Sequence, residues 1–293
     1  MKHTSVFLLV FALNIAVHGQ LVMSNDRSKF NQNTELLVLD YASIRCHYQF
    51  VQKDKAGQLQ TDTMTLDIGA QMSEYYDMAR QRQDSLYSAY LNNIPMSSIR
   101  SISVLKDNDA FEPDGFGGAS FSSGRPKESA RLYKNRQTGE IFIIDILPSV
   151  RDKGRFTETI RPQAWQIAAD TATILGYPCQ KATASFRGRN YEAWFSPEIP
   201  VNDGPWKFFG LPGLILKVTD TGNFFSFVCV GMENLGTPRD ITIQKEKYIN
   251  CSRDEMAKIK SKQTGETRIT NYGGDIIIST LKAKDNYHSL ELE

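Results

Sequence analysis

The sequence predicts a mainly β (α+β) fold, with a curved antiparallel sheet or half-barrel and one helix packed on it. Short runs in which apolar and polar residues alternate follow one another along most of the 293-residue chain. Glycines separate several of these runs where hairpins would turn. A helical period occurs early, and alternating strand–helix units are missing, which argues against a parallel nucleotide-binding sheet.

The first expected elements are a hairpin and a helix. Apolar residues alternate with polar ones over Ile44–Phe50 and again over Thr63–Ile68, with a turn at Lys53–Gly57 between them. From Ser73 the period becomes helical, with Ser73 placed as the N-cap and Pro95 as the stop. This part of the chain is therefore expected to form two paired strands and the packed helix.

Strand signals return after residue 130. Residues 96–130 are polar, rich in Gly, Ser and Asp, and without a sustained period, so we expect a long mobile excursion there. A short charged helix is expected at Arg253–Lys260, and the chain after it is polar apart from Ile276–Ile278 and Leu290–Leu292. The later expected strands are Arg131–Asn135, Gly139–Leu147, Phe156–Ile160, Tyr177–Phe186, Asn190–Phe195, Leu214–Asp220 and Phe224–Glu233.

The N-terminal residues have the pattern of a secretory signal peptide. Lys2 and His3 precede the apolar run Val6–Val17, and small residues end at Gly19. The alternative is a membrane anchor, but the run is shorter than the ~20 residues that span a bilayer. No Cys lies near the cleavage point, and no later stretch is apolar enough to span. We expect a signal peptide over residues 1–19 and one soluble β-rich domain over 20–293, periplasmic or extracellular and not a lipoprotein.

Four cysteines leave the disulfide state open. An exported chain with an even number of Cys permits disulfides, whereas a domain of this size can also keep buried free thiols. Because a hairpin could join them, Cys229 and Cys251 are the first pair to test. The other two cysteines are Cys46 and Cys179.

Charge and motifs exclude several function classes. The formal net charge is +1, from 34 basic and 33 acidic residues, so nothing indicates a nucleic-acid partner. G-x-S-x-G and H-E-x-x-H are absent, and after cleavage only His47 and His288 remain as bases for a nucleophile such as Cys179. The loop Asp107–Gly115 is oxygen-rich, but Phe111 stands where a calcium loop needs a ligand, which favours a solvated acidic loop. We expect no metal and no cofactor.

The segment Tyr191–Asp220 is the most unusual part of the chain. It holds two Trp, three Phe, four Pro and three Gly, too many prolines for a helix and too many aromatics for a surface linker. We expect a rigid loop that plugs one end of the sheet, or else aromatics that line the mouth of an apolar ligand groove. The candidate residues for either role are Trp194, Pro197, Trp206, Lys207, Phe208, Phe209, Gly210, Leu211, Pro212, Gly213 and Leu214.

Basic residues surround this segment. Lys181, Arg187, Arg189 and Lys207 could meet an anionic ligand, or they could solvate one face of the sheet. Solvation is the more ordinary role for such residues.

The motif Phe209–Ile215 (FGLPGLI) resembles the signature of the GLPGLI family, exported proteins of the Bacteroidetes. The similarity extends upstream through Gly176–Ala182, Phe186–Arg189 and Ala193–Pro200, and more weakly to the Ile44 strand and Leu290–Leu292. The resemblance implies a compartment and a lineage, and it carries over no catalytic residue. The order of the strands is also similar to the half-barrel of periplasmic lipoprotein carriers, in which a curved sheet cups a ligand.

Two functional hypotheses follow. In the first, a non-enzymatic exported protein binds an apolar ligand, a peptide or an outer-membrane or other envelope partner on its concave sheet. In the second, an enzyme of unrecognised type uses carboxylates and a lysine near the motif for acid–base chemistry. The second hypothesis requires Glu192, Glu198, Asp203 and Lys207 to approach one another.

Overall fold

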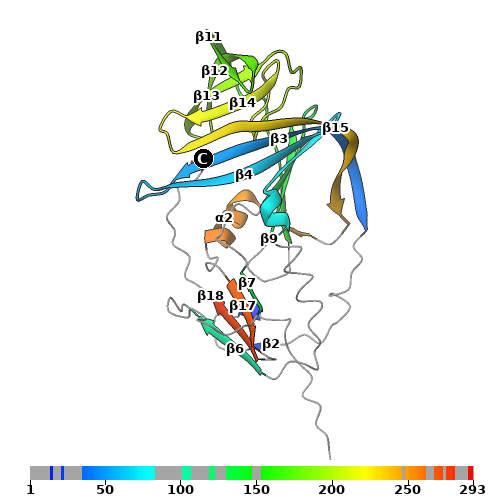
Figure 1. Ribbon diagram of the computed structural model, residues 1–293, viewed down its shortest axis with the longest axis vertical. Helices are drawn as coiled ribbons and strands as arrows, with labels where there is room; N and C mark the ends of the chain where they lie inside the picture. Colours follow the sequence, from blue (N-terminus) through cyan, green and yellow to red (C-terminus); the bar gives the residue numbers. More distant parts are fainter. Residues whose placement is uncertain are drawn as a thin grey trace, which may run out of the picture.

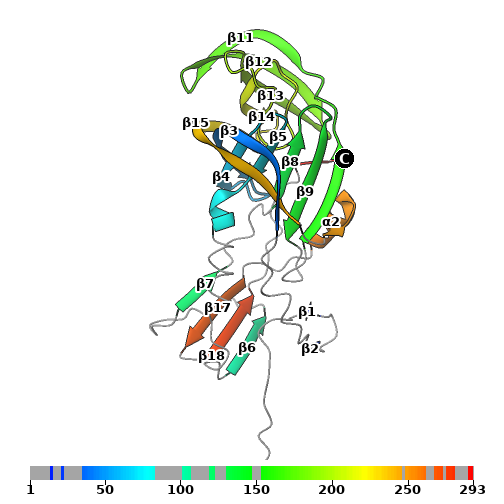
Figure 2. The same cartoon turned by 90° about the vertical axis from the view of Figure 1, so that its right-hand side faces the viewer.

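The computed structural model of the chain is drawn in two views in Figures 1 and 2. The structure describes residues 14–15, 21–22, 35–82, 101–106, 119–122, 130–146, 153–245, 248–261, 267–272, 275–280 and 290–292.

One twelve-stranded sheet contains most of the described chain and curves through the upper part of Figure 2. Its strands are β3 (Leu36–Lys53), β4 (Leu59–Ile68), β5 (Met72–Tyr76), β8 (Arg131–Asn135), β9 (Glu140–Ile146), β10 (Lys153–Thr159), β11 (Gln166–Ile174), β12 (Tyr177–Phe186), β13 (Arg189–Ser196), β14 (Leu214–Asp220), β15 (Phe225–Gln244) and β16 (Ile249–Asn250). They lie in the order β11-β12-β13-β14-β15-β3-β4-β5-β8-β9-β10-β16. All neighbours are antiparallel except β10 and β16. The predicted mainly β, antiparallel fold is therefore confirmed.

Two smaller sheets complete the described strands. β6 (Ser101–Lys106), β18 (Asp275–Thr280), β17 (Thr267–Tyr272) and β7 (Ala119–Ser122) form a four-stranded sheet in that order. β1 (Asn14–Ile15) pairs with β2 (Leu21–Val22). The predicted excursion at 96–130 therefore contains two strands. Their partners lie in the later stretch that the sequence marked as polar apart from Ile276–Ile278, which belongs to β18.

Of the two predicted helices, the first differs from the prediction and the second is confirmed. Ser73 and Glu74 do not begin a helix: they are buried in β5, where both neighbouring strands pair with them. Helical residues start at 78 and are described to 82, while residues 83–95 of the predicted helix lie outside the described chain. α2 (Arg253–Ser261) confirms the second helix. Its start is a capping box, in which the Glu255 amide donates to the Ser252 hydroxyl (3.2 Å) and Glu255 accepts from the Ser252 amide (2.7 Å).

The two faces of the large sheet differ in character. Cys46, Tyr48, Leu66 and Leu132 belong to the main hydrophobic core, which lies on what we call the inner face. Their neighbours along each strand point to the opposite side, the outer face. Among them, Asp67 is fully buried although it is charged.

The two longest strands continue beyond the main core. β3 and β15 run side by side with three irregularities in their register, one of them between Asn234 and Arg239. Past this point the pair bends away from the rest of the sheet (Figure 1). There it contributes to a second apolar cluster of Ala42, Tyr133, Phe142, Ile144, Ile241 and Ile243. No helix among the described residues is long and apolar enough to cross a membrane.

Candidate functional site

The loop between β13 and β14 fills the space beside the inner face. Phe208 at its centre is completely buried, and its ring centroid lies 4.7 to 6.2 Å from five other aromatic rings. These rings are Trp165, Phe186, Tyr191, Trp206 and Phe227. Such tilted and edge-to-face pairs stabilise a packed aromatic cluster. The apolar side chains of this loop therefore occupy the interior themselves.

A buried lysine from β8 holds the backbone of this loop. The Lys134 ammonium is fully buried and donates to the carbonyl oxygens of Gly204 (3.0 Å), Trp206 (3.3 Å) and Phe208 (3.1 Å). It also pairs with Asp203 at 2.5 Å. Burial lowers the pKa of Lys134, and the Asp203 carboxylate opposes that shift. Because three carbonyls and one charge converge on it, Lys134 fixes the shape of the loop.

Two glycines allow the loop to pass close to other backbone. A Cβ at Gly213 would lie 2.1 Å from the Ser196 carbonyl oxygen. Gly210 has a φ of +104°, and a Cβ there would lie 2.5 Å from Pro162. Side chains at either position would collide with their surroundings, which explains both glycines of the motif.

The predicted plug residues divide into three groups by exposure. Lys207, Phe208, Phe209, Leu211, Gly213 and Leu214 are buried, Trp194, Trp206 and Gly210 are partly exposed, and Pro197 and Pro212 are exposed. Trp194 donates its indole N–H to Glu192 at 3.1 Å, apart from the aromatic cluster around Phe208. Whether any of these residues binds a ligand stays a prediction.

The four residues of the enzyme hypothesis have separate surroundings. Glu192 pairs with Lys181 (2.6 Å), which, with Trp194, holds its pKa below the usual value. Asp203 pairs with Lys134, and Lys207 pairs with Glu291 at 2.5 Å and with Glu158. Glu198 is exposed. Among the described residues, no hydrogen bond or ion pair joins any two of the four, so they form no common acid–base site there.

No disulfide joins Cys229 and Cys251, the pair named as the first to test. All four cysteines are free, and the Cys229 thiol on β15 donates to the carbonyl oxygen of Gly231 at 3.4 Å. Cys251 lies instead 3.7 Å from the carbonyl oxygen of Arg155, beside β10. Six strands separate β15 from β16 in the sheet, which is why the expected Cys229–Cys251 hairpin is absent.

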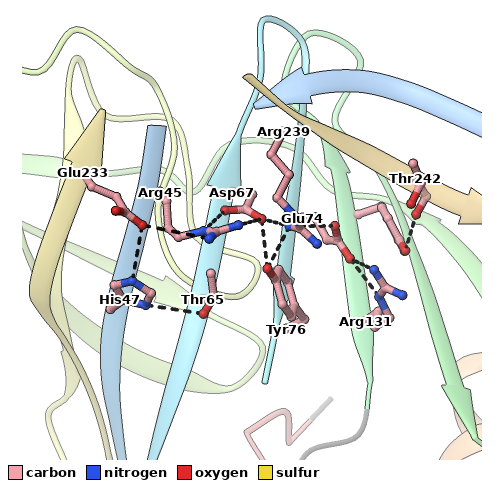
Figure 3. Close-up of polar contacts among 11 residues, drawn as sticks. Arg45, His47, Thr65, Asp67, Glu74, Tyr76, Arg131, Glu233, Arg239 and Thr242 are labelled. Atoms are coloured by element: carbon pink, nitrogen blue, oxygen red, sulfur yellow. Dashed lines mark hydrogen bonds and ion pairs between the residues drawn. The ribbon is translucent and has the colours of Figure 1, made fainter. Parts of the chain in front are cut away.

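The outer face carries a row of charged side chains across five strands, drawn in Figure 3. Arg45 on β3 donates from Nε and Nη2 to the two oxygens of Asp67 on β4 (2.7 and 3.1 Å). Asp67 also accepts from Arg239 of β15 and from the Tyr76 hydroxyl (3.0 Å). Arg131 on β8 donates from Nε to Glu74 on β5 at 2.8 Å. We call these residues the outer-face row.

Two further contacts extend the outer-face row. Arg239 Nη1 lies 2.8 Å from the Tyr76 hydroxyl and 3.8 Å from Glu74 Oε2, which links the Asp67 and Glu74 halves. At the other end, the Glu233 carboxylate lies 3.9 Å from Arg45 Nη1 and 3.8 Å from His47 Nε2. His47 thus lies on the partly exposed side of its strand.

Exposure within the outer-face row differs by sign of charge. The side chains of Asp67 and Glu74 are 0% exposed, whereas those of Arg45, Arg131 and Arg239 are 17%, 29% and 34% exposed. Burial raises the pKa of Glu74 although Arg131 opposes the shift, and burial with the Glu74 charge raises the pKa of Tyr76 to about 12. Asp67 and Glu74 are therefore turned inward and the three arginine side chains remain partly in solvent, while Glu233 at one end of the row is 52% exposed.

Sequence reasoning found only His47 of this row. Arg45 and Asp67 have the appearance of ordinary strand charges, Glu74 was expected in the first turn of a helix, and Arg239 lies 172 residues from Asp67. The only local signal was the alternation that puts Arg45 and Asp67 opposite the core side chains. His288 and the acidic loop 107–115 lie outside the described residues. Within the described chain, no group of three or more His, Cys, Asp or Glu is placed to hold a metal.

Comparison with known proteins adds a local sequence match and a distant structural likeness. A family model described as a protein of unknown function (Porph_ging) matches residues 186–217, the stretch that contains the motif. No curated protein sequence matches the chain. Two structures of PNGF-II, in the C2 and P21 space groups, are similar at 12% and 11% identity with a TM-score of 0.48. They cover 75% of this chain, which spans only 32% and 33% of theirs, too distant a likeness to indicate an activity.

Proposed function

We propose that the chain is a non-enzymatic, exported member of the GLPGLI family that binds an acidic segment of a cell-envelope protein. The signal-peptide pattern and the family-model match over residues 186–217 support the lineage and the compartment. The observation that carries the binding part is the difference in exposure within the outer-face row. The fully buried carboxylates of Asp67 and Glu74 hold three arginines whose side chains remain 17–34% exposed.

Such an arrangement is suited to binding rather than to catalysis. Asp67 and Glu74 are buried and already paired, so neither carboxyl is free to reach a substrate. Arginines that are held before a partner arrives lose less side-chain entropy on binding, and they recognise carboxylates through paired N–H donors. Arg239 contacts Asp67, Tyr76 and Glu74 through Nη1, and its side chain is the most exposed of the three.

We therefore propose that the partner binds the outer face of the sheet and not the inner face, where the sequence predicted the contact. The expected apolar groove beside the plug would have to accept a ligand where Phe208, Phe209 and Leu211 are already packed. On the outer face, by contrast, a partner needs to displace no core side chain.

Binding of a fluorescein-labelled oligoglutamate peptide tests this proposal. We expect saturable binding that weakens as salt rises, and a loss of at least tenfold in affinity for Arg239→Ala. The matched control is Lys245→Ala, which removes an exposed cation paired with the exposed Glu35 and should leave the affinity unchanged. Equal affinities for the two variants would contradict the proposal. So would binding to vesicles of an anionic lipid without binding to the peptide.

A further inference from the structure

The segment Leu290–Leu292 is bound against the interior of the sheet. The Tyr191 hydroxyl donates to the carbonyl oxygen of Leu290 at 3.2 Å, and the amide of Leu292 donates to the carbonyl oxygen of Arg187 at 3.0 Å. The side chain of Leu290 packs against the main core. One backbone hydrogen bond, one hydrogen bond from a side chain and an apolar anchor thus hold the segment in place.

Between the two leucines, Glu291 meets three cations. Its carboxylate lies 2.5 Å from Lys207 Nζ, 3.5 Å from Arg253 Nη1 and 3.9 Å from Arg187 Nε. Lys207 is only 1% exposed and Glu291 is 16% exposed, so the closest of these ion pairs is shielded from water. The pair is therefore stronger than one on the surface.

The three cations come from parts of the chain that are far apart in sequence. Lys207 lies in the loop between β13 and β14, Arg187 lies in the turn between β12 and β13, and Arg253 begins α2. The second carboxylate at this place is Glu158 of β10, which pairs with Lys207 and with Arg187 at 2.7 Å. Without Glu291, the Glu158 carboxylate would be alone with three cations, and it pairs with only two of them, Lys207 and Arg187. The site therefore requires a second carboxylate.

We propose that Lys207, Arg187, Arg253 and Tyr191 form a recognition site for an acidic peptide of the Leu-Glu-Leu type, which the chain's own Leu290–Leu292 segment occupies in cis. The carboxylate is read by the three cations, and the backbone by the Tyr191 hydroxyl and the Arg187 carbonyl. Since the segment is tethered, it competes at a high effective concentration and closes the site to the same peptide in trans. This site is separate from the outer-face row, and the inference does not depend on the proposed function.

The inference is tested in the full chain by reversing the charge of Glu291, which should release the segment from the site. Glu291→Lys places a cation against Lys207 and should release the segment, whereas Glu291→Gln should release it less. The matched control is Glu140→Lys, the same charge change at an exposed position. The probe is a fluorescein-labelled peptide of residues 285–293, compared with the same peptide carrying Gln in place of Glu at position 291.

We expect the peptide to bind Glu291→Lys at least tenfold more tightly than the unaltered chain or Glu140→Lys. The Gln peptide should bind at least tenfold more weakly than the Glu peptide, and Arg253→Ala in the Glu291→Lys background should weaken binding severalfold. Equal binding to the unaltered chain and to Glu291→Lys would overturn the inference, as would equal binding of the two peptides. If Glu291→Lys does not fold, the affinity of the peptide for Glu291→Gln is compared with that for the unaltered chain, and a smaller gain in affinity is expected.

A further variant separates this site from the outer-face row. Arg239→Ala should not change peptide binding to Glu291→Lys, because Arg239 belongs to the other site. If Arg239→Ala abolished it, the peptide would be bound by the outer-face row and the recognition site at Lys207 would be wrong.

Discussion

The two charged regions of the sheet differ in whether their cations are buried. Around the loop between β13 and β14 the cations are buried, since Lys134 of β8 is 0% and Lys207 is 1% exposed, and so is their neighbour Asp203 at 0%. In the outer-face row Asp67 and Glu74 are buried, whereas the arginines that pair with them reach solvent. A buried cation that donates hydrogen bonds to carbonyl oxygens fixes the shape of a loop. A buried anion instead holds its partner cation in place, and the part of that cation that reaches solvent stays available to a binding partner. The charges around the loop therefore stabilise the fold, whereas the charges of the outer-face row could also bind a partner.

The largest expected effect is on the interior loop itself. Gly213→Val should destabilise the protein by about 4 kcal/mol or more, because the new side chain would collide with the Ser196 carbonyl oxygen, 2.1 Å from the Cβ. Thermal and urea unfolding measure this loss. The control is Gly57→Val in the turn before β4, where nothing lies within 4 Å of a Cβ and only the positive φ of +83° causes strain. Unfolding of Gly213→Val at the wild-type midpoint would contradict the plug.

Removing the buried cation should have the next largest effect. Lys134→Met leaves three carbonyl oxygens and part of the Asp203 carboxylate without their donor, a loss of about 3–5 kcal/mol. Asp203 keeps Arg136 at 3.2 Å, so the charge is not left alone.

A double-mutant cycle sharpens this prediction. The measurement is urea unfolding of Lys134→Met, Asp203→Asn and the double variant, whose coupling energy should exceed about 1 kcal/mol because the two groups touch. If Lys134→Met cost less than about 1 kcal/mol, burial of the cation would not fix the loop, and the two regions would not differ as described.

The sequence predicted most strands of the large sheet, missed β5, β11, β16 and the four-stranded sheet, and was insufficient for both charged regions. Alternation predicted Arg131–Asn135, Tyr177–Phe186 and Leu214–Asp220 with the bounds of β8, β12 and β14. It failed at Ser73, where a cap-like Ser and Glu are overridden by pairing of β5 with β4 and β8. These local patterns reflect the two-residue repeat of a strand, which is visible within a few consecutive residues of the sequence.

The charged regions depend on contacts that no short window contains. Lys134 binds a carbonyl 70 residues away, at Gly204. The prolines and glycines of the motif indicated a rigid loop, but nothing near Lys134 marked it as the residue that holds this loop. A charged residue in a strand has the same local pattern whether it is solvated or buried beside a partner, so only the fold distinguishes the two.

The alkaline pH dependence of stability tests the electrostatics of the outer-face row. The pKa of Tyr76 is raised to about 12 from 10.0, mainly by burial and then by the Glu74 charge. Between pH 10 and 12 the unfolded chain loses the phenolic proton while the folded chain keeps it, so this contribution to stability is complete below pH 10 and is lost as pH rises to 12. The loss is up to about 1.4 kcal/mol per pH unit.

Tyr76→Phe should remove this share of the pH dependence. Urea unfolding at pH 9, 10, 11 and 12 should show a shallower decline for Tyr76→Phe than for the wild type. Tyr41→Phe, whose side chain is 59% exposed, is the control and should decline like the wild type. Parallel curves for Tyr76→Phe and the wild type would mean that the row is open enough for the phenol to ionise as it does in water.

The smallest expected effect is the one that decides whether the outer-face row is a binding surface or a second structural core. Arg239→Ala should cost only about 1 kcal/mol, because Asp67 keeps both of its bonds to Arg45 and the Arg239 side chain is already 34% exposed. Lys245→Ala, which breaks an ion pair between two exposed side chains, gives the reference for a surface charge and should cost less than about 0.5 kcal/mol. A loss of 3 kcal/mol or more for Arg239→Ala would put this arginine in the same class as Lys134. Its charge would then be engaged within the fold, and an acidic partner would have to compete with Asp67 for it. A loss near 1 kcal/mol, combined with the tenfold loss of peptide affinity, would show that the guanidinium contributes more to the partner than to the fold.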